Sequence, residues 1–237
     1  MQQVPHEEMQ QELRAELEQG FDTISEITTS YNEDDDRVIT EISDVFRDVN
    51  PGLNMTRLYN NLKDAQQLHL GHYRNSGEPY IAHVASVGSI LASWGLPENV
   101  IYAGNLHDCV EENGKDRLEV MNSLYVTYDV TTFLMVVAMT VFEDNPDVKD
   151  RVLYGKIDTF KSMFGLEYLS EGKSADGIHN LYSKKHMIGK NGMSALERQQ
   201  RYASVVGENI LPLAREVDEK GELMLEVGSY IEYLMKK

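Results

Sequence analysis

Residues 101–112 read Ile-Tyr-Ala-Gly-Asn-Leu-His-Asp-Cys-Val-Glu-Glu, an apolar segment that carries His107 and Asp108 in its middle. An imidazole and a carboxylate are costly to bury unless each is paired or bound to a cation. On a helix, Glu111 lies one turn beyond both of these residues, and Glu112 lies one turn beyond Asp108. The segment indicates either a hydrogen-bonded pair at a helix surface or a metal centre with a carboxylate base beside it. The dipeptide alone does not decide between the two.

Outward from this segment, apolar residues recur at three- and four-residue steps, as in Leu13, Leu17 and Phe21. This is the period of an amphipathic helix, so we expect an all-α helical bundle. Pro79 and Pro97 stand where a first helical turn accepts proline. The expected helices cover about residues 6–29, 36–48, 55–71, 79–94, 98–112, 129–139, 148–163 and 175–187, with two or three more between 193 and 235.

The composition narrows the class of protein. The 237 residues include a single cysteine, Cys109, which excludes an internal disulfide and a cysteine-based zinc cage. Any metal must therefore be held by His, Asp or Glu. No apolar run approaches the roughly 20 residues that a membrane helix needs. The first eleven residues are too polar for a signal peptide, so we expect a cytoplasmic protein.

The charge is negative and unevenly distributed. A net charge of −17 repels phosphate backbones and anionic lipid, which argues against nucleic-acid polymers and membranes as partners. Residues 1–50 carry fourteen acidic residues and three arginines, whereas residues 149–201 carry ten basic residues against six acidic ones and could attract a small anion. The apolar stripe through Leu13, Leu17, Phe21, Ile24 and Ile27 predicts that the acidic N-terminal helix packs on the rest of the chain.

Two further segments accompany the His-Asp pair. Residues 69–83 read His-Leu-Gly-His-Tyr-Arg-Asn-Ser-Gly-Glu-Pro-Tyr-Ile-Ala-His, and residues 173–181 read Lys-Ser-Ala-Asp-Gly-Ile-His-Asn-Leu. In this order and spacing, the three segments resemble the hydrolase domain of the RelA/SpoT homologue family, which belongs to the HD phosphohydrolase superfamily and degrades the alarmone (p)ppGpp. The resemblance covers about residues 55–205. Its Arg-x-Ser-Gly-Glu-Pro-Tyr-x-x-His pattern is far more specific than a His-Asp pair.

The resemblance implies a role for each matching side chain. The implied ligands of a manganese ion are His83, His107, Asp108 and Asp176, two imidazoles and two carboxylates, a set that suits a divalent first-row ion. Glu111 and Glu112 would orient or activate the attacking water. Implied substrate contacts are Arg74 and Ser76 to the purine, Asn180 to the nucleotide and Ser183 near the same pocket. His69 and His179 match positions that would support this site.

The implied organisation is an acidic helical extension over residues 1–50 followed by an HD-type metal-dependent phosphohydrolase domain over residues 51–237. The implied reaction removes pyrophosphate from the 3′ position of (p)ppGpp and yields GDP or GTP. The chain ends at Lys237, some sixty residues past Asp176, which leaves no room for a synthetase domain and suggests a small alarmone hydrolase. Whether the chain forms a homo-oligomer stays open.

Two positions depart from the family pattern. Gly177 stands where the family usually has arginine, and Asn75 stands where a basic residue is often found. Both changes remove positive charge near the expected site. They leave open the same chemistry on an adenine alarmone or on the 2′-phosphate of NADPH. A non-catalytic module that senses a nucleotide is a separate alternative, against which the intact ligand set argues.

Overall fold

The computed structural model describes residues 6–142 and 146–183, with a few separate positions between 194 and 208. Across these residues every regular element is a helix, accompanied by one isolated bridge between Tyr73 and Pro79, so the predicted all-α class is confirmed. The elements in chain order are α1 (His6–Ser30), α2 (Asp36–Val49), α3 (Met55–Leu68), α4 (Tyr80–Ser93), α5 (Glu98–Leu106), α6 (Cys109–Glu112), the short 3-10 helix η1 (Gly114–Asp116), α7 (Arg117–Thr127), α8 (Val130–Met139), α9 (Pro146–Phe164) and α10 (Leu169–Tyr182).

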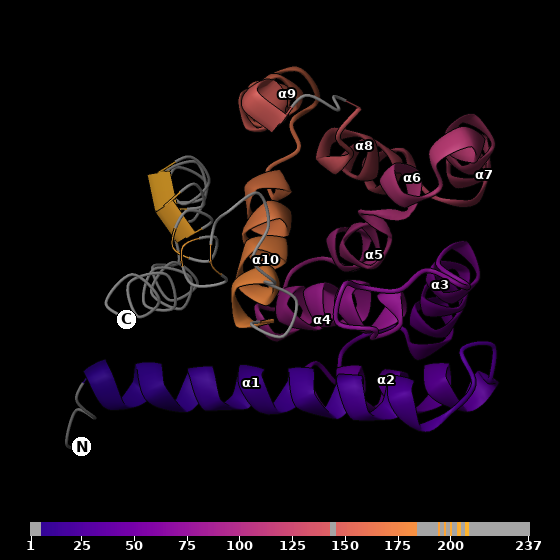
Figure 1. The fold of residues 1–237 in the computed structure, drawn as a ribbon, viewed down its shortest axis with the longest axis vertical. Helices are drawn as coiled ribbons and strands as arrows, with labels where there is room; N and C mark the ends of the chain where they lie inside the picture. Colours follow the sequence, from indigo (N-terminus) through magenta and orange to yellow (C-terminus); the bar gives the residue numbers. More distant parts are fainter. Residues whose placement is uncertain are drawn as a thin grey trace.

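Helix α4 lies at the centre of the described fold (Figure 1). Helices α1 and α2 cover one side of it, while α5 and α10 pack against the other. Helix α8 packs on α5, and α7 and α9 pack in turn on α8. Fully buried Ile90, Ile101 and Leu106 fill the space around α4 and α5. None of the described helices combines the length and the apolar character that a membrane crossing requires.

Short polar residues and prolines begin most of the helices as the sequence indicates. Asp35 accepts a hydrogen bond from the backbone N–H of Arg37, so part of the acidic run at residues 33–36 caps α2. Asp129 caps α8 in the same way. Pro79 and Pro97 directly precede the first residues of α4 and α5, where a missing N–H costs nothing.

The prediction of a single helix over residues 98–112 is wrong. The segment breaks at His107 and Asp108, where α5 ends at Leu106 and α6 begins at Cys109. The apolar pattern continues through the break, which is why the sequence did not reveal it. The sequence analysis did not predict helix α7. Its apolar residues Leu118, Tyr125 and Val126 do not form the stripe of a buried helix face, and in the structure these three side chains are exposed.

Other boundaries differ by a few residues. Helix α3 ends at Leu68, before the expected residue 71, and Gly71 follows with a φ of 79°. Helix α10 begins at Leu169, six residues before the expected 175, because Leu169, Ser170 and Glu171 are buried in its first turn. The expected helical residues 184–187, and the segments expected between 193 and 235, lie outside the continuous described ranges.

The acidic N-terminal helix packs on the core, as its apolar stripe predicts. Phe21, Ile24 and Ile27 are buried, whereas Leu17 is partly buried. These residues belong to the same apolar cluster as the buried residues of α2 and α4. A domain boundary at residue 50 stays a prediction.

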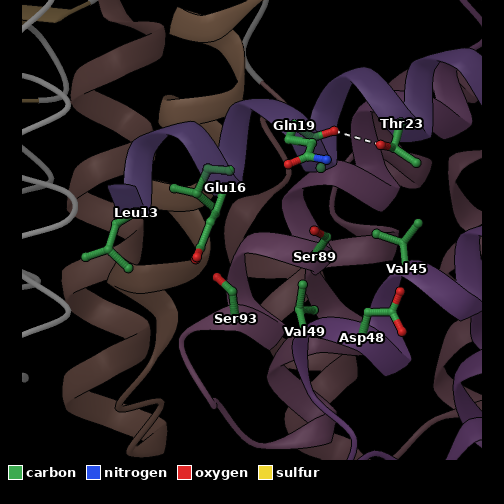
Figure 2. Close-up of a pocket in the computed structure, with 11 residues that line it drawn as sticks. Leu13, Glu16, Gln19, Thr23, Val45, Asp48, Val49, Ser89 and Ser93 are labelled. Atoms are coloured by element: carbon green, nitrogen blue, oxygen red, sulfur yellow. Dashed lines mark hydrogen bonds between the residues drawn. The ribbon is translucent and has the colours of Figure 1, made fainter. Parts of the chain in front are cut away.

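A cavity of about 520 Å³ lies between α1 and the ends of α2 and α4 (Figure 2). Figure 2 shows Ser89 and Ser93 of α4 facing Leu13, Glu16 and Gln19 of α1 across this space. The packing of α1 on α4 is therefore incomplete at this end. The full lining comprises Leu13, Glu16, Leu17, Gln19, Gly20, Thr23, Val45, Asp48, Val49, Ser89 and Ser93.

Candidate metal centre

Three helices and one turn bring four polar side chains to a single point beside α4. His83 comes from α4, His107 from the end of α5, Asp108 from the turn that follows, and Asp176 from α10. His83 Nε2 lies 3.5 Å from Asp108 Oδ2 and 3.4 Å from Asp176 Oδ1. His107 Nε2 lies 3.3 Å from Asp108 Oδ1 and 3.6 Å from Asp176 Oδ1. The four positions predicted as metal ligands thus converge, although His83 and Asp176 are 93 positions apart in the sequence.

Two glycines allow α4 and α5 to cross closely enough for this convergence. A Cβ atom on Gly88 would lie 1.8 Å from Oδ1 of Asn105, and one on Gly104 would lie 2.5 Å from Leu91. Neither position leaves room for a side chain. The amide of Asn105 donates a hydrogen bond to Asn61 Oδ1 of α3 at 2.8 Å, which anchors the crossing from behind. The tight crossing places His83 and His107 5.2 Å apart between ring centroids.

The two imidazoles are oriented so that their Nε2 atoms face the carboxylates. Nδ1 of His107 lies 2.8 Å from the carbonyl oxygen of Gly104, which can only accept, so this nitrogen carries a proton. Nδ1 of His83 lies 2.7 Å from Nδ1 of His179. A neutral ring held in this way presents the Nε2 lone pair, as metal-ligating histidines do. His179 therefore orients His83, the supporting role that the sequence suggested for it.

The centre has the donor set of a divalent cation site. Both Nε2 atoms are buried and have no hydrogen-bond partner in the described part of the chain. The N···O separations of 3.3–3.6 Å exceed an ordinary hydrogen bond of about 2.7–3.2 Å. They match the roughly 3.0–3.6 Å expected between ligands that each lie about 2.0–2.2 Å from one ion. His83, His107 and Asp108 offer ligand atoms within 4.8 Å of one another, and the residues present fit a divalent metal.

The charges of this centre are strongly coupled. Burial opposes ionisation of Asp108 and Asp176, but the neighbouring histidines, and for Asp176 also Lys173, outweigh it and hold both carboxyl pKa values well below the usual range. Burial likewise opposes protonation of His107, yet Asp108 and Asp176 raise its pKa to about 10. Burial, aided by the charge of Arg74, lowers the pKa of His83. The two carboxylates therefore stabilise the positive charge of a protonated His107. A bound cation would take the place of that proton.

Asp176 also contacts two residues of its own helix, in addition to the imidazoles. Lys173, three residues earlier on α10, forms an ion pair with Asp176 Oδ2. Asn180, one turn later, donates to Asp176 Oδ1, and Arg74 Nη2 donates to the Asn180 side-chain oxygen at 2.6 Å. Lys173 was not among the predicted site residues, but its i, i+3 spacing from Asp176 was a readable signal. Arg74 and Asn180 join the metal centre through this chain of hydrogen bonds.

A turn presents Arg74 to the site. The backbone N–H of Arg74 donates to the carbonyl of Glu78 at 2.8 Å, and Gly77 has a φ of 85°, which favours glycine. Ser76 is exposed on this turn, where its hydroxyl accepts from the backbone N–H of Glu78 at 3.3 Å. The structure therefore places Arg74 against the metal centre and leaves Ser76 at the surface.

The two glutamates differ in their contacts. Oε2 of Glu111 accepts the backbone N–H of Val141 at 3.1 Å, which ties the end of α6 to the segment after α8. Oε1 of Glu112 lies 3.2 Å from the hydroxyl of Tyr80, and that hydroxyl also donates to Asp108 Oδ2 at 2.8 Å. Partial burial of its carboxylate and the charge of Asp108 raise the pKa of Glu112. Glu112 itself remains accessible from the solvent.

Tyr80 is a second residue at this centre to which the sequence analysis assigned no role. It ends the Ser-Gly-Glu-Pro-Tyr run, and that position was its only signal. Burial and the charge of Asp108 raise the pKa of its hydroxyl, so it remains a donor. Ser183 lies at the opposite end of the group. It is buried, and its hydroxyl lies 3.4 Å from Nδ1 of His179.

Comparison with known proteins agrees with this geometry. Residues 62–128 match the family model of the HD domain, a range that includes His83, His107, Asp108 and both glutamates. The chain is 29% identical over 160 residues to the guanosine-3′,5′-bis(diphosphate) 3′-pyrophosphohydrolase of Borreliella burgdorferi, an alignment that covers 66% of this chain and 22% of that protein.

Other relatives align over shorter stretches. The chain is 35% identical over 77 residues to the bifunctional (p)ppGpp synthase/hydrolase RelA of Mycobacterium tuberculosis. This alignment covers 32% of this chain and 10% of that protein. The chain is 44% identical over 48 residues to the guanosine-3′,5′-bis(diphosphate) 3′-pyrophosphohydrolase of Haemophilus influenzae. This alignment covers 20% of this chain and 7% of that protein. The chain thus spans about a fifth or less of the length of these relatives. Residues 62–128 thus match the HD domain, and the chain is similar to proteins that are named as (p)ppGpp hydrolases.

Proposed function

We propose that the chain hydrolyses the 3′-pyrophosphate of (p)ppGpp, with GDP or GTP and pyrophosphate as products, and that its divalent metal is manganese. The observation that carries the proposal is the group of two buried imidazole nitrogens, which have no hydrogen-bond partner among the described residues, and two carboxylates that face them, with Glu112 beside it. The names of the relatives supply the substrate class. His83, His107, Asp108 and Asp176 would hold the metal, which when bound polarises a phosphoryl oxygen and lowers the pKa of water.

Glu112 is our candidate for the general base. During hydrolysis a water oxygen forms a bond to the phosphorus attached to the 3′ oxygen, the bond from that phosphorus to the 3′ oxygen breaks, and the 3′ oxygen takes up a proton. Glu112 is accessible and has a raised pKa, which suits a group that accepts the proton of the attacking water. Glu111 is engaged by the backbone of Val141, so we assign it the role of fixing α6.

The surroundings favour a polyphosphate despite the charge of −17. Arg74 and Lys173 both reach the centre, one through Asn180 and the other at Asp176. We propose that Arg74 and Asn180 bind the nucleotide, with Ser76 and Ser183 at the edge of the same site. A guanidinium at this position can stack on a purine and also neutralise phosphate charge. The partner is thus a small nucleotide, and the oligomeric state stays open.

The neighbouring glutamates provide a matched test. Purified protein is incubated with Mn²⁺ and ppGpp, and pyrophosphate release is followed with and without chelator. Glu112→Gln is expected to lower kcat by about 10²–10⁴-fold, because the amide cannot accept the proton. Glu111→Gln keeps an oxygen that can accept from Val141 and is expected to retain most of the activity.

The same assay is run with an adenine alarmone and with NADPH, which test the alternative substrates. Turnover of either in preference to ppGpp would redirect the proposal to that nucleotide. Absence of metal-dependent release from all three, in protein shown to bind the metal, would contradict a catalytic function and favour a nucleotide-sensing module.

A further inference from the structure

The hydroxyl of Tyr80 connects the metal centre to Glu112. Tyr80 is the first residue of α4 and is 8% exposed. Its hydroxyl lies 2.8 Å from Asp108 Oδ2 and 3.2 Å from Glu112 Oε1. Asp108 and Glu112 stand at opposite ends of the short helix α6, so one hydroxyl contacts both carboxylates.

The ring of Tyr80 is held on three sides. His69 stacks on it with ring centroids 4.8 Å apart and an interplanar angle of 14°. His83 meets it edge-on at 5.7 Å, and the guanidinium of Arg74 lies 5.4 Å from its centre. The hydroxyl therefore has little freedom to leave the carboxylates.

His69 contributes to this arrangement through its shape. It is 2% exposed, and among the described residues neither of its ring nitrogens has a hydrogen-bond partner. Its closest ring contact is the stack on Tyr80. A flat ring at this position is what the contact requires, and no hydrogen bond from His69 takes part.

We propose that Tyr80 is a positioning residue that sets Asp108 toward the metal and Glu112 toward the attacking water, with His69 as the flat support for its ring. The role of Glu112 in this inference rests on the proposed function, whereas the role of Asp108 rests on the metal centre alone. Removing an outer hydrogen-bond partner of a metal ligand typically costs 10–100-fold in metal affinity or activity. The two effects are measured separately.

The first test compares two buried tyrosines whose hydroxyls donate to carboxylates. Tyr80→Phe removes the hydroxyl and keeps the stacked ring. Tyr102 is 7% exposed, and its hydroxyl donates to Glu98 Oε2 at 3.0 Å, so Tyr102→Phe is the matched control. Mn²⁺ alone is titrated by electron paramagnetic resonance. We expect Tyr80→Phe to bind Mn²⁺ about 10-fold more weakly and Tyr102→Phe to bind it as the unchanged protein does.

Kinetics at saturating Mn²⁺ separate positioning from packing. Tyr80→Phe should lower kcat about 10-fold with little change in KM, because Glu112 is misoriented while the nucleotide contacts remain. Unchanged Mn²⁺ affinity in Tyr80→Phe, or equal losses in both tyrosine variants, would overturn the inference. If the unchanged protein binds Mn²⁺ but releases no pyrophosphate, the proposed function fails and the Mn²⁺ titrations still decide the role of Tyr80.

A second pair of variants keeps the inference testable if Tyr80→Phe does not fold. His69→Phe retains a flat ring against Tyr80 and should bind Mn²⁺ with unchanged affinity. His69→Ala removes the stack and should weaken binding several-fold, within the range expected for an outer contact. Equal affinities for the two His69 variants would refute the supporting stack.

Discussion

The two ends of helix α4 are packed in opposite ways. At its beginning, the polar atoms of Tyr80 and His83 lie against polar groups from the turn after α5, from α6 and from α10. Toward its end, Ser89 and Ser93 line a cavity of about 520 Å³ under α1 (Figure 2). Gly88, at the α5 crossing, separates the two ends.

The difference shows where this sequence requires accurate packing. Ionisable groups are stable inside a protein only when partners or a cation compensate them, so the beginning of α4 tolerates few changes. The cavity end is lined by hydroxyls, an amide, two carboxylates and aliphatic side chains, and the open space beside them leaves room for small changes. We therefore expect substitutions at the first end to affect metal binding and substitutions at the second to affect stability slightly.

The largest effect is expected for Asp176→Asn. The amide keeps the shape of the side chain but removes one of two negative charges that face the imidazoles, at 3.4 and 3.6 Å. Metal-assisted catalysis supplies several kcal/mol, so pyrophosphate release should fall by about 10³-fold or more. Metal content measured by mass spectrometry should fall with it.

Asp64→Asn is the control for this variant. Asp64 lies on α3 and is not one of the proposed ligands, and its Oδ2 accepts a hydrogen bond from the hydroxyl of Tyr128 at 2.6 Å. We expect its metal content to match that of the unchanged protein. A metal-loaded and active Asp176→Asn variant would contradict the proposed difference between the two ends of α4, because the first end would then tolerate the loss of a ligand.

A smaller loss is expected for Gly88→Ala at the crossing. The new Cβ would lie 1.8 Å from Asn105 Oδ1, so either the amide or the helix must move. Overpacking of this kind typically costs about 1–3 kcal/mol of unfolding free energy. Urea denaturation measures the change, and the displaced α5 should also weaken Mn²⁺ binding. An unchanged free energy of unfolding would show that the crossing is looser than the contact implies.

The sequence predicted the parts of this molecule that depend on residue type and local pattern. Helical periodicity indicated the all-α class, and the stripe through Phe21 and Ile24 predicted the burial of α1. The candidate ligands His83, His107, Asp108 and Asp176 were named because imidazoles and carboxylates in that order resemble a known family. Their roles stay a proposal until the metal is measured.

Other features depend on contacts between segments that no local pattern records. The break at His107 and Asp108 follows an unbroken apolar run, and it turns both side chains to one point. The assignment of different roles to Glu111 and Glu112 needed the positions of Val141 and Tyr80. Neighbours in sequence became distinguishable only when their partners in space were known.

A modest gain is expected for Gly20→Ala at the cavity. Gly20 lies within α1, and a Cβ atom there would meet no atom of the described residues within 4 Å. Alanine is favoured over glycine in a helix by roughly 0.5–1 kcal/mol, so the free energy of unfolding should rise by about that amount. Metal affinity should stay unchanged. Both glycine variants are measured in the same experiment. A loss of stability in Gly20→Ala, like the loss expected for Gly88→Ala, would contradict the proposed difference in packing between the two ends of α4.

The smallest effect is a pH dependence at Lys156, a half-buried charge outside the metal centre. Its ammonium donates to the carbonyls of Val137 and Thr140 at the end of α8, and burial lowers its pKa to about 8 from 10.5, although Glu111 opposes the shift. Between these two values the unfolded chain holds a proton that the folded chain has lost, so stability rises with pH. Thermal unfolding at pH 7.5, 9 and 10 should therefore show the unchanged protein gaining stability relative to Lys156→Met. A difference that stays constant or reverses would mean that the carbonyls compensate the charge fully, as partners do at the beginning of α4.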